Sequence, residues 1–272
     1  MKQNSVLRPD RRTASIAHRN VVEEGPQDRK PDLSDFTFLI PLRIDSETRK
    51  ENADTVIRFI LRHFKTNFIV LEGDIVQKSN PGLNKKNFYY KYLKDRRKLF
   101  YKTWYIQKLI EMADTPYVAV WDADVIAPYD QIMKSAEVLR SGGSLLSIPY
   151  DGRVHKCDEL LSDIFRRTPG IEILMKLMPA LPLMYGYNSP GGAFMTDRDK
   201  YLELGGENLS FKSWGPEDTE RIKRFEVLNL TVHRCEGPLF HLWHPRGQNS
   251  WYADRNEEIY NRRELIKTCS KI

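Results

Sequence analysis

The stretch VAVWDADVIAP, residues 118–128, is the part of the sequence that says most about the fold. Its apolar start predicts a buried strand, and two acids, Asp122 and Asp124, follow directly. In open α/β sheets, ligands bind beyond the carboxyl ends of the strands. Two oxygen ligands at positions i and i+2 on a turning strand end can reach one Mg²⁺ or Mn²⁺ ion. Because Asp is also common in turns, an ordinary turn after the strand is the alternative.

The sequence around this stretch alternates between predicted strands and predicted helices. Apolar residues spaced three and four apart predict a helix, and short apolar runs on both sides of it predict strands. Strand, helix and strand in succession indicate a right-handed parallel unit, and the continued alternation is typical of an open α/β sheet. The predicted strands are residues 36–42, 67–73, 117–124 and 144–150, and the predicted helices are residues 47–64, 104–113 and 130–143.

The second half of the chain is less regular. Residues 157–187 mix apolar residues with Pro and Gly, which predicts one or two helices and a loop. We then expect a short strand and a short helix that is stopped by Gly205 and Gly206. A helix with Pro216 at its first position, a strand carrying two histidines and a terminal helix over residues 251–269 complete the prediction.

Length and composition indicate a globular protein. The chain has 272 residues, of which 40% are hydrophobic, so it can bury a core. Residues 1–34 are polar and without period, which predicts an N-terminal arm before a single domain over residues 35–272. Residues 84–102 carry eight basic side chains and one acid. Such a patch can bind nucleic acid, phosphorylated small molecules or an anionic membrane, and the alternative is a solvated helix face with an apolar back.

The cysteines and the apolar segments of the chain indicate in which cellular compartment the protein is expected. Cys157, Cys235 and Cys269 are far apart and form no CxxC pair, so neither a disulfide framework nor a structural zinc site is expected. No apolar run reaches the length of a membrane span, and the first residues lack the apolar segment of a secretory signal. We expect a soluble, cytoplasmic protein of a bacterial type, with peripheral association at the inner face of the membrane as the alternative.

Three further groups of residues can carry chemistry. His241 and His244 follow an apolar strand and can bind a metal, although a lone histidine is more often an ordinary core or surface residue. Glu217 and Asp218 lie in a predicted first helical turn, where acids commonly complement the helix dipole; the same place keeps a general base ionised. The glycines in PGGAF, residues 190–194, allow a ligand close to the backbone or mark a tight turn.

The order of these motifs resembles that of the GT-A nucleotide-sugar glycosyltransferases. PLR, DAD, GGAF, WGPED and HLWH follow one another, and the second half is similar to the C-terminal region of the β-1,4-galactosyltransferase and chondroitin-polymerase-like families. The resemblance covers roughly residues 36–250 and is most specific between Gly191 and His244. It implies an open mixed sheet flanked by helices, with a nucleotide-binding half over about 35–150 and an acceptor-binding half over about 151–272.

The resemblance also implies a role for each residue of these motifs. Asp218 matches the catalytic base, and the neighbouring Glu217 and Trp214 match acceptor-binding residues. The metal, Mn²⁺ or Mg²⁺, would be bound by Asp124 and His244, with His241 where the family can use a methionine. The residues that match the donor-binding positions are Pro41, Arg43, Asp122, Gly191 and Gly192. The chain departs from the family pattern at Pro216, Thr219 and Glu220, which lie at the acceptor subsite.

The activity implied is an inverting, metal-dependent transfer of a sugar from a UDP-sugar donor to a saccharide hydroxyl. Galactose or N-acetylgalactosamine are the expected sugars, and a glycan or lipid-linked saccharide of a bacterial surface polysaccharide is the expected acceptor. Residues 84–102 would then face lipid phosphate or membrane, and no nucleic acid is expected. Two rival interpretations are a phosphatase-type DxD and a non-catalytic GT-A-like module that binds nucleotide or polyanion. The first leaves WGPED and HLWH without a role.

Overall fold

A computed structural model describes residues 30–82, 86–247, 250 and 254–270. Its core is a mixed seven-stranded sheet with the strand order β3-β2-β1-β4-β8-β6-β9. β1 pairs in parallel with β2 and β4, whereas β8 runs antiparallel to β4 and β6. The strands of this sheet are β1 (Asp32–Leu42), β2 (Lys65–Asp74), β3 (Phe88–Lys94), β4 (Tyr117–Trp121), β6 (Leu146–Ile148), β8 (Ala193–Asp197) and β9 (Val232–Arg234).

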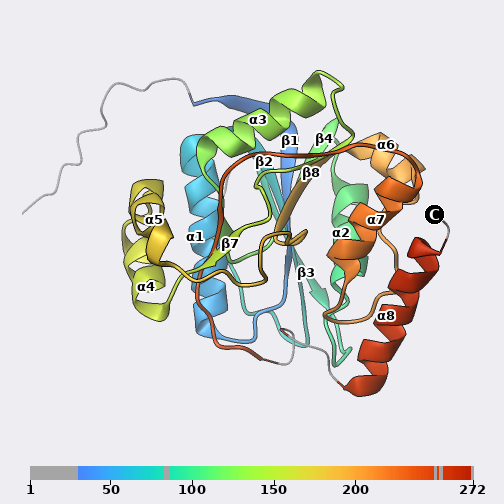
Figure 1. The fold of residues 1–272 in the computed structure, drawn as a ribbon. Coiled ribbons are helices and arrows are strands. Elements are labelled where there is room, and N and C mark those ends of the chain that lie inside the picture. Colours follow the sequence, from blue (N-terminus) through green and yellow to red (C-terminus); the bar gives the residue numbers. More distant parts are fainter. Residues whose placement is uncertain (1–29, 83–85, 248–249, 251–253, 271–272) are drawn as a thin grey trace, which may run out of the picture. The chain divides into compact units, whose positions relative to one another are not determined.

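Helices cover both faces of the sheet (Figure 1). The right-handed connections from β1 to β2 and from β3 to β4 run in opposite directions along the sheet, so α1 and α2 pack on opposite faces. None of the helices in the described part of the chain has the length and hydropathy needed to cross a bilayer. The helices are α1 (Glu47–His63), α2 (Lys102–Met112), α3 (Tyr129–Arg140), α4 (Glu159–Arg167), α5 (Ile171–Leu177), the 3-10 turn η1 (Met178–Ala180), α6 (Arg198–Glu203), α7 (Glu217–Val227) and α8 (Arg255–Cys269).

The first half confirms the predicted parallel unit. Ser46 caps α1 by accepting a hydrogen bond from the Arg49 amide, and the apolar face of α1 is buried against the sheet. β1 is longer than expected, because it begins at Asp32. The expected arm over residues 1–34 falls mostly on residues 1–29, which lie outside the described residues. Its separation from residues 35–272 stays a prediction, as does the division of that domain into two halves.

The interpretation of residues 84–102 as a solvated helix face is wrong. Residues 88–94 form β3, the edge strand of the sheet, and the side chains of Tyr90 and Tyr92 turn back to hydrogen-bond with Glu72 and with carbonyl groups at the end of β2. Half-buried and exposed positions alternate over residues 88–92, which is the period of a strand. Phe88, Tyr90 and Tyr92 therefore mark the inner face of an edge strand, whereas Tyr89 is exposed.

The second half has the elements that the sequence predicted, with shifted boundaries and two additional strands. Pro216 is the N-cap of α7 and not its first residue, and neither β9 nor a short strand β7 (Val154–Lys156) was expected. A small second sheet has the order β5-β10-β7 and joins distant parts of the chain. In it, His241 lies opposite Val125 because β10 pairs antiparallel with β5. Its strands are β5 (Val125–Ile126), β7 (Val154–Lys156) and β10 (Leu239–His241).

Candidate active site

A cavity of about 400 Å³ opens beyond the carboxyl ends of β1 and β4. This is the edge at which ligands bind in open α/β sheets. The cavity brings together every residue that the sequence singled out, from segments as far apart as β1 and the end of β10. These residues are Pro41, Arg43, Asp122, Asp124, Gly191, Gly192, Trp214, Glu217, Asp218, His241 and His244.

Asp124, His241 and His244 form a group of side chains that can hold a metal ion. One ligand atom from each lies within 4.8 Å of the other two. His241 Nε2 is 3.6 Å from Asp124 Oδ1, and His244 Nε2 is 3.2 Å from Asp124 Oδ2. The pairing of β5 with β10 creates this arrangement, and a hydrogen bond of 2.8 Å from the Leu242 amide to the Asp124 carbonyl continues it. The second sheet therefore positions the ligands.

The protonation of these groups suits a divalent cation. Burial lowers the pKa of His241 to about 4, so its imidazole is neutral at pH 7 and has a lone pair to offer. Burial by itself would raise the pKa of Asp124. The neighbouring histidines and Arg49 outweigh burial and hold the pKa of this carboxyl well below its usual range. One ionised carboxylate and two imidazoles are donors that first-row divalent metals accept. The residues present therefore fit Mn²⁺.

Arg49, in the first turn of α1, lies against the same ligands. Its Nη1 is 3.2 Å from Asp124 Oδ2, and its Nη2 is 3.2 Å from His244 Nδ1. The guanidinium also contacts Asp45 and Ser250 at 2.9 and 3.3 Å. A positive side chain thus balances the buried carboxylate of Asp124. An incoming metal ion would compete with this guanidinium for Asp124 and His244.

Asp218 also lines the cavity and lies in the first turn of α7. Arg221 Nη1 donates to Asp218 Oδ1 at 2.7 Å, and Lys102 Nζ is 3.8 Å from Asp218 Oδ2. Burial opposes ionisation of this carboxyl, but the charges of Lys102 and Arg221 lower its pKa. Gly191 faces Asp218 Oδ2 so closely that a Cβ at this position would collide with it. One carboxylate oxygen is thus held by Arg221, while the other faces the cavity wall formed by Gly191.

Glu217, next to Asp218, has a different environment. Its side chain is buried, and its Oε2 atom has no hydrogen-bond partner within the described residues. Burial and the charge of Asp218 raise the pKa of Glu217 to about 8. Two neighbouring carboxyl groups thus differ in charge at neutral pH. Asp218 contacts both cations directly, whereas the burial of Glu217 outweighs the effect of the same charges on its pKa. Such a separation of pKa values is typical of acid–base sites.

Lys102 joins Asp122 to Asp218. Its Nζ atom is 2.9 Å from Asp122 Oδ1, and although burial disfavours its charge, the two acids raise its pKa. The Asp122 amide donates to the Gly192 carbonyl at 2.8 Å, which extends the pairing of β4 with β8. The Asp122 carboxylate therefore points toward Lys102. The two acids of the DxD motif have different partners.

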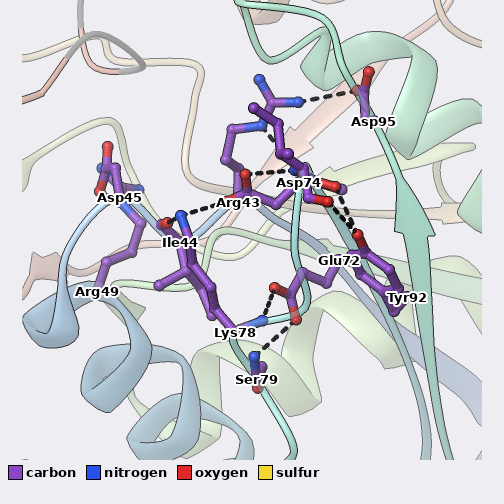
Figure 2. Close-up of polar contacts among 12 residues, drawn as sticks. Arg43, Ile44, Asp45, Arg49, Glu72, Asp74, Lys78, Ser79, Tyr92 and Asp95 are labelled. Atoms are coloured by element: carbon purple, nitrogen blue, oxygen red, sulfur yellow. Dashed lines mark hydrogen bonds and ion pairs between the residues drawn. The ribbon is translucent and has the colours of Figure 1, made fainter.

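Arg43 lines the cavity, but its guanidinium is already engaged. It donates to the Gly73 carbonyl at 2.8 Å, to the Arg97 carbonyl at 3.1 Å and to Asp95 at 3.0 Å. Figure 2 shows this contact with Asp95 and, beside it, Glu72 accepting from the amides of Lys78 and Ser79. Arg43 thus fixes the ends of β1 and β2 and the loop after β3. Its assignment to the donor site stays a prediction.

Three basic residues that contact the expected acids were not predicted from the sequence. Arg49, Lys102 and Arg221 each contact one of the expected acids. Arg221 was detectable in principle, because residues three apart on a helix are neighbours. Arg49 is a cation in the first turn of a helix, where acids are usual, and this departure was the available signal. Lys102 closes the basic stretch and had no separate signal.

The fold and the site together define the class. A mixed sheet with a DxD pair after a central parallel strand, and with the cavity at its carboxyl edge, is the GT-A glycosyltransferase fold.

Comparisons with known proteins agree with this class. A family model described as the N-terminal domain of galactosyltransferase matches residues 173–245, which include Trp214, Glu217, Asp218, His241 and His244. Among solved structures, a mutant of Drosophila β1,4-galactosyltransferase 7 in complex with manganese, UDP-Gal and xylobiose is similar at 16% identity and a TM-score of 0.53. That match covers 85% of this chain and 79% of the other.

A second structure, the catalytic domain of Drosophila β1,4-galactosyltransferase 7 in complex with xylobiose, is 18% identical with a TM-score of 0.46. It covers 75% of this chain, and this chain spans 64% of that domain. None of the curated proteins compared with the chain matches it. At these identities, the structural likeness concerns the fold.

Proposed function

We propose that the protein is a metal-dependent glycosyltransferase that transfers a sugar from a UDP-sugar to a saccharide hydroxyl. The observation that carries the proposal is the meeting of two groups in one cavity: the metal-ligand group of Asp124, His241 and His244, and the ionised Asp218. The match of residues 173–245 to a galactosyltransferase model supports it. So does the likeness of the fold to an enzyme crystallised with manganese and UDP-Gal.

The donor would lie across the metal-ligand group. Asp124, His241 and His244 would hold Mn²⁺ or Mg²⁺, and a bound ion offsets the charge of a diphosphate leaving group. Pro41 and Asp122 would line the nucleoside end of the donor, and Gly191 and Gly192 would lie against the sugar. Lys102 and Arg49 supply two further positive charges for the diphosphate.

Asp218 would act as the general base. Because Arg221 occupies Oδ1, the Oδ2 atom is the one that would accept the proton of the acceptor hydroxyl. The hydroxyl oxygen then forms a bond to the anomeric carbon while the bond from that carbon to the UDP oxygen breaks. A single displacement of this kind inverts the anomeric configuration, so an α-linked donor would give a β-linked product. The transition state has oxocarbenium character, as in glycoside hydrolysis.

Glu217 and Trp214 would bind the acceptor. The Glu217 carboxyl is protonated at neutral pH and can donate a hydrogen bond as well as accept one, and its Oε2 atom has no partner within the described residues. Trp214 lines the cavity next to this carboxyl and offers an apolar face for a sugar ring. Galactose or N-acetylgalactosamine is the donor sugar we favour, and a growing bacterial surface polysaccharide, as a glycan or lipid-linked saccharide, is the acceptor we favour.

A lipid-linked acceptor would place the protein at a membrane, and the basic stretch supplies a surface for it. Lys86, Lys91, Lys94 and Arg96 are exposed on and beside β3. Their charge would attract anionic headgroups. Co-sedimentation with vesicles containing phosphatidylglycerol, and none with phosphatidylcholine vesicles, is the expected result. Equal sedimentation of a variant with Lys91 and Lys94 changed to Glu would remove this part of the proposal.

The central test measures UDP release from a panel of UDP-sugars, with Mn²⁺ and with a chelator. The proteins are the wild type, Asp124→Ala and, as a matched control, Asp130→Ala, whose side chain is 67% exposed on α3. Donor hydrolysis by water replaces transfer while the acceptor is unidentified. We expect Mn²⁺-dependent release from one donor for the wild type and the control, and none for Asp124→Ala.

Two outcomes would contradict the proposal. Release that persists in the chelator and in Asp124→Ala would exclude the metal-ligand group from the reaction. Binding of UDP and Mn²⁺ without release from any donor would favour the non-catalytic nucleotide-binding module.

A further inference from the structure

The loop that leads into α7 is held by a side chain from the C-terminal helix. This loop, residues 211–216, carries Trp214. It leads directly into Glu217 and Asp218, the first two residues of α7. Asn261 on α8 accepts a hydrogen bond from the Lys212 amide at 3.2 Å and donates to the Lys212 carbonyl at 2.8 Å. A third hydrogen bond runs from its Nδ2 to the Trp214 carbonyl at 3.4 Å. One carboxamide thus fixes the main chain on both sides of Ser213.

Burial protects these three hydrogen bonds from competition by water. Asn261 is 0% exposed, so water does not compete for its amide. Its oxygen accepts once and its nitrogen donates twice, which satisfies the group. The paired bonds with Lys212 copy those that two strands exchange, so they fix the direction of the loop as well as its position. A buried amide with this pattern specifies one loop conformation, because any other would leave polar atoms unpaired.

The loop backbone shows that this conformation is imposed on it. Ser213 has a φ of +60° although it is not glycine, and it is buried. Such a conformation is costly for a residue with a Cβ and persists only where surrounding contacts require it. A Cβ on Gly215 would come within 2.8 Å of Asn261 Nδ2. The glycine and the asparagine therefore fit one another.

The rest of α8 supports the same contact. The Lys212 ammonium lies 4.7 Å from the centre of the Tyr260 ring. Further along, Thr268 donates to Glu220 of α7 at 3.0 Å, and the two helices lie side by side (Figure 1). α8 begins at Arg255, beyond the segment that matches the galactosyltransferase model.

We propose that Asn261 is a positioning residue for the acceptor side of the active site. It acts through the loop, by holding Trp214 in the cavity wall and by fixing the start of α7, where Glu217 and Asp218 lie. Its role in turnover rests on the proposed function, whereas its role in placing Trp214 does not. A misplacement of about 1 Å can cost about 10²-fold in rate. We therefore expect loss of Asn261 to reduce turnover by up to about 10²-fold while donor binding is kept, because the donor site lies on other elements.

The experiment compares Asn261→Leu with Thr268→Val. The first removes the three hydrogen bonds to the loop at similar volume, and the second removes a hydrogen bond between the same two helices but leaves the loop alone. Each variant is made in two forms, one with Trp214 and one with Trp214→Phe. The fluorescence difference between the two forms belongs to Trp214, and its quenching by acrylamide is measured. UDP·Mn²⁺ affinity and UDP release from the best donor are measured on the same proteins. If Asn261→Leu does not fold, Gly215→Ala takes its place, because a Cβ on Gly215 would come within 2.8 Å of Asn261 Nδ2 and push the loop away from this side chain.

Greater quenching of Trp214 in Asn261→Leu, with UDP·Mn²⁺ affinity unchanged and UDP release reduced, is the expected result. Thr268→Val should match the wild type in all three. Unchanged quenching of Trp214 in Asn261→Leu would overturn the proposal, as would an equal effect of Thr268→Val. If the wild type released no UDP from any donor, the proposed function would fail, and the quenching comparison would still decide whether Asn261 places the loop.

Discussion

The carboxylates at the two ends of the cavity have different charged neighbours. At the metal end, Asp124 supplies the carboxylate of the metal-ligand group, and it faces two imidazoles and Arg49. At the acid end, Asp122 and Asp218 both form ion pairs with Lys102, and Arg221 forms a second ion pair with Asp218. The first arrangement places imidazole nitrogen atoms beside one carboxylate, and the second fixes which acid is ionised.

The difference teaches how one cavity can separate binding from proton transfer. A cation is bound best where lone pairs converge, and burial keeps His241 unprotonated for that purpose. A proton is accepted best by a carboxylate that is ionised yet not fully engaged, which describes Asp218 Oδ2. The two ends are built on different elements, the second sheet and the start of α7. Variants at one end should therefore leave the other intact.

The largest effect is expected for Asp124→Ala, which removes the carboxylate of the metal-ligand group. Loss of groups that merely orient a ligand lowers metal affinity by roughly 10–100-fold. Loss of this ligand should exceed that range and bring UDP release below detection. Isothermal titration with Mn²⁺ measures it, with Asp130→Ala as the control. Mn²⁺ affinity equal to that of the wild type would remove Asp124 from the metal site.

Asp218→Asn tests the acid end with the next largest effect. The amide keeps the shape but cannot take a proton, and loss of a positioned base typically costs about 10²–10⁴ in rate. UDP·Mn²⁺ affinity should stay at the wild-type value. Asp199→Asn, an exposed acid that is likewise in the first turn of a helix, serves as the control. Turnover by Asp218→Asn equal to that of the control would end the assignment of the base.

Arg49→Gln sharpens the comparison at the metal end. The guanidinium competes with a cation for Asp124 and His244, so its loss should tighten Mn²⁺ binding in the absence of donor. We expect a change of up to about tenfold, which corresponds to about 1.4 kcal/mol. Titration followed by Mn²⁺ electron paramagnetic resonance measures it, and Arg58→Gln, an exposed arginine on the same helix, is the control. Weaker Mn²⁺ binding would show instead that Arg49 orients the ligands.

Glu217→Gln has the smallest expected effect, on the pH dependence of stability. The folded pKa of about 8 lies above the ordinary value of 4.5. The folded state therefore retains a proton that the unfolded state loses, and stability falls as the pH rises from about 4.5 to about 8. The amide of Glu217→Gln does not titrate, so this variant does not lose stability in this way. Its Tm relative to that of the wild type should therefore rise as the pH increases from about 4.5 to about 8.

For a chain of this size, roughly 2–4 °C of Tm corresponds to each kcal/mol gained. Differential scanning fluorimetry at pH 5 and pH 8.5 measures the change, with the exposed Glu203→Gln as the control. A Tm difference between Glu217→Gln and wild type that is the same at both pH values would show that Glu217 is ionised in the folded protein.

Much of the site was readable from the sequence, because each motif follows a strand or begins a helix. The apolar run before Asp122 placed the DxD pair at a sheet edge, and the WGPED motif placed Asp218 in a first helical turn. The meeting of Asp124 with His241 was not derivable from residue patterns, since β5 has two residues and pairs with a strand more than a hundred positions away. The resemblance to a family supplied that link.

The counter-charges and the supports were the parts that the sequence did not predict. Lys102 and Arg221 select which carboxyl is ionised, but a lysine or an arginine in a basic chain gives no signal of its partner. Residues 84–102 show the same limit, because an edge strand with exposed lysines and with Tyr90 and Tyr92 half-buried has a sequence that also fits a basic helix face. Asn261 lies in a terminal helix far along the chain, and only its contacts reveal its place.

The most direct test of the division between the two ends is the binding of UDP·Mn²⁺ to three proteins, measured by isothermal titration calorimetry. The account predicts that the wild type and Asp218→Asn bind with equal affinity and that Asp124→Ala does not bind. Binding to Asp124→Ala at the wild-type affinity, or loss of binding in a folded Asp218→Asn, would contradict the account.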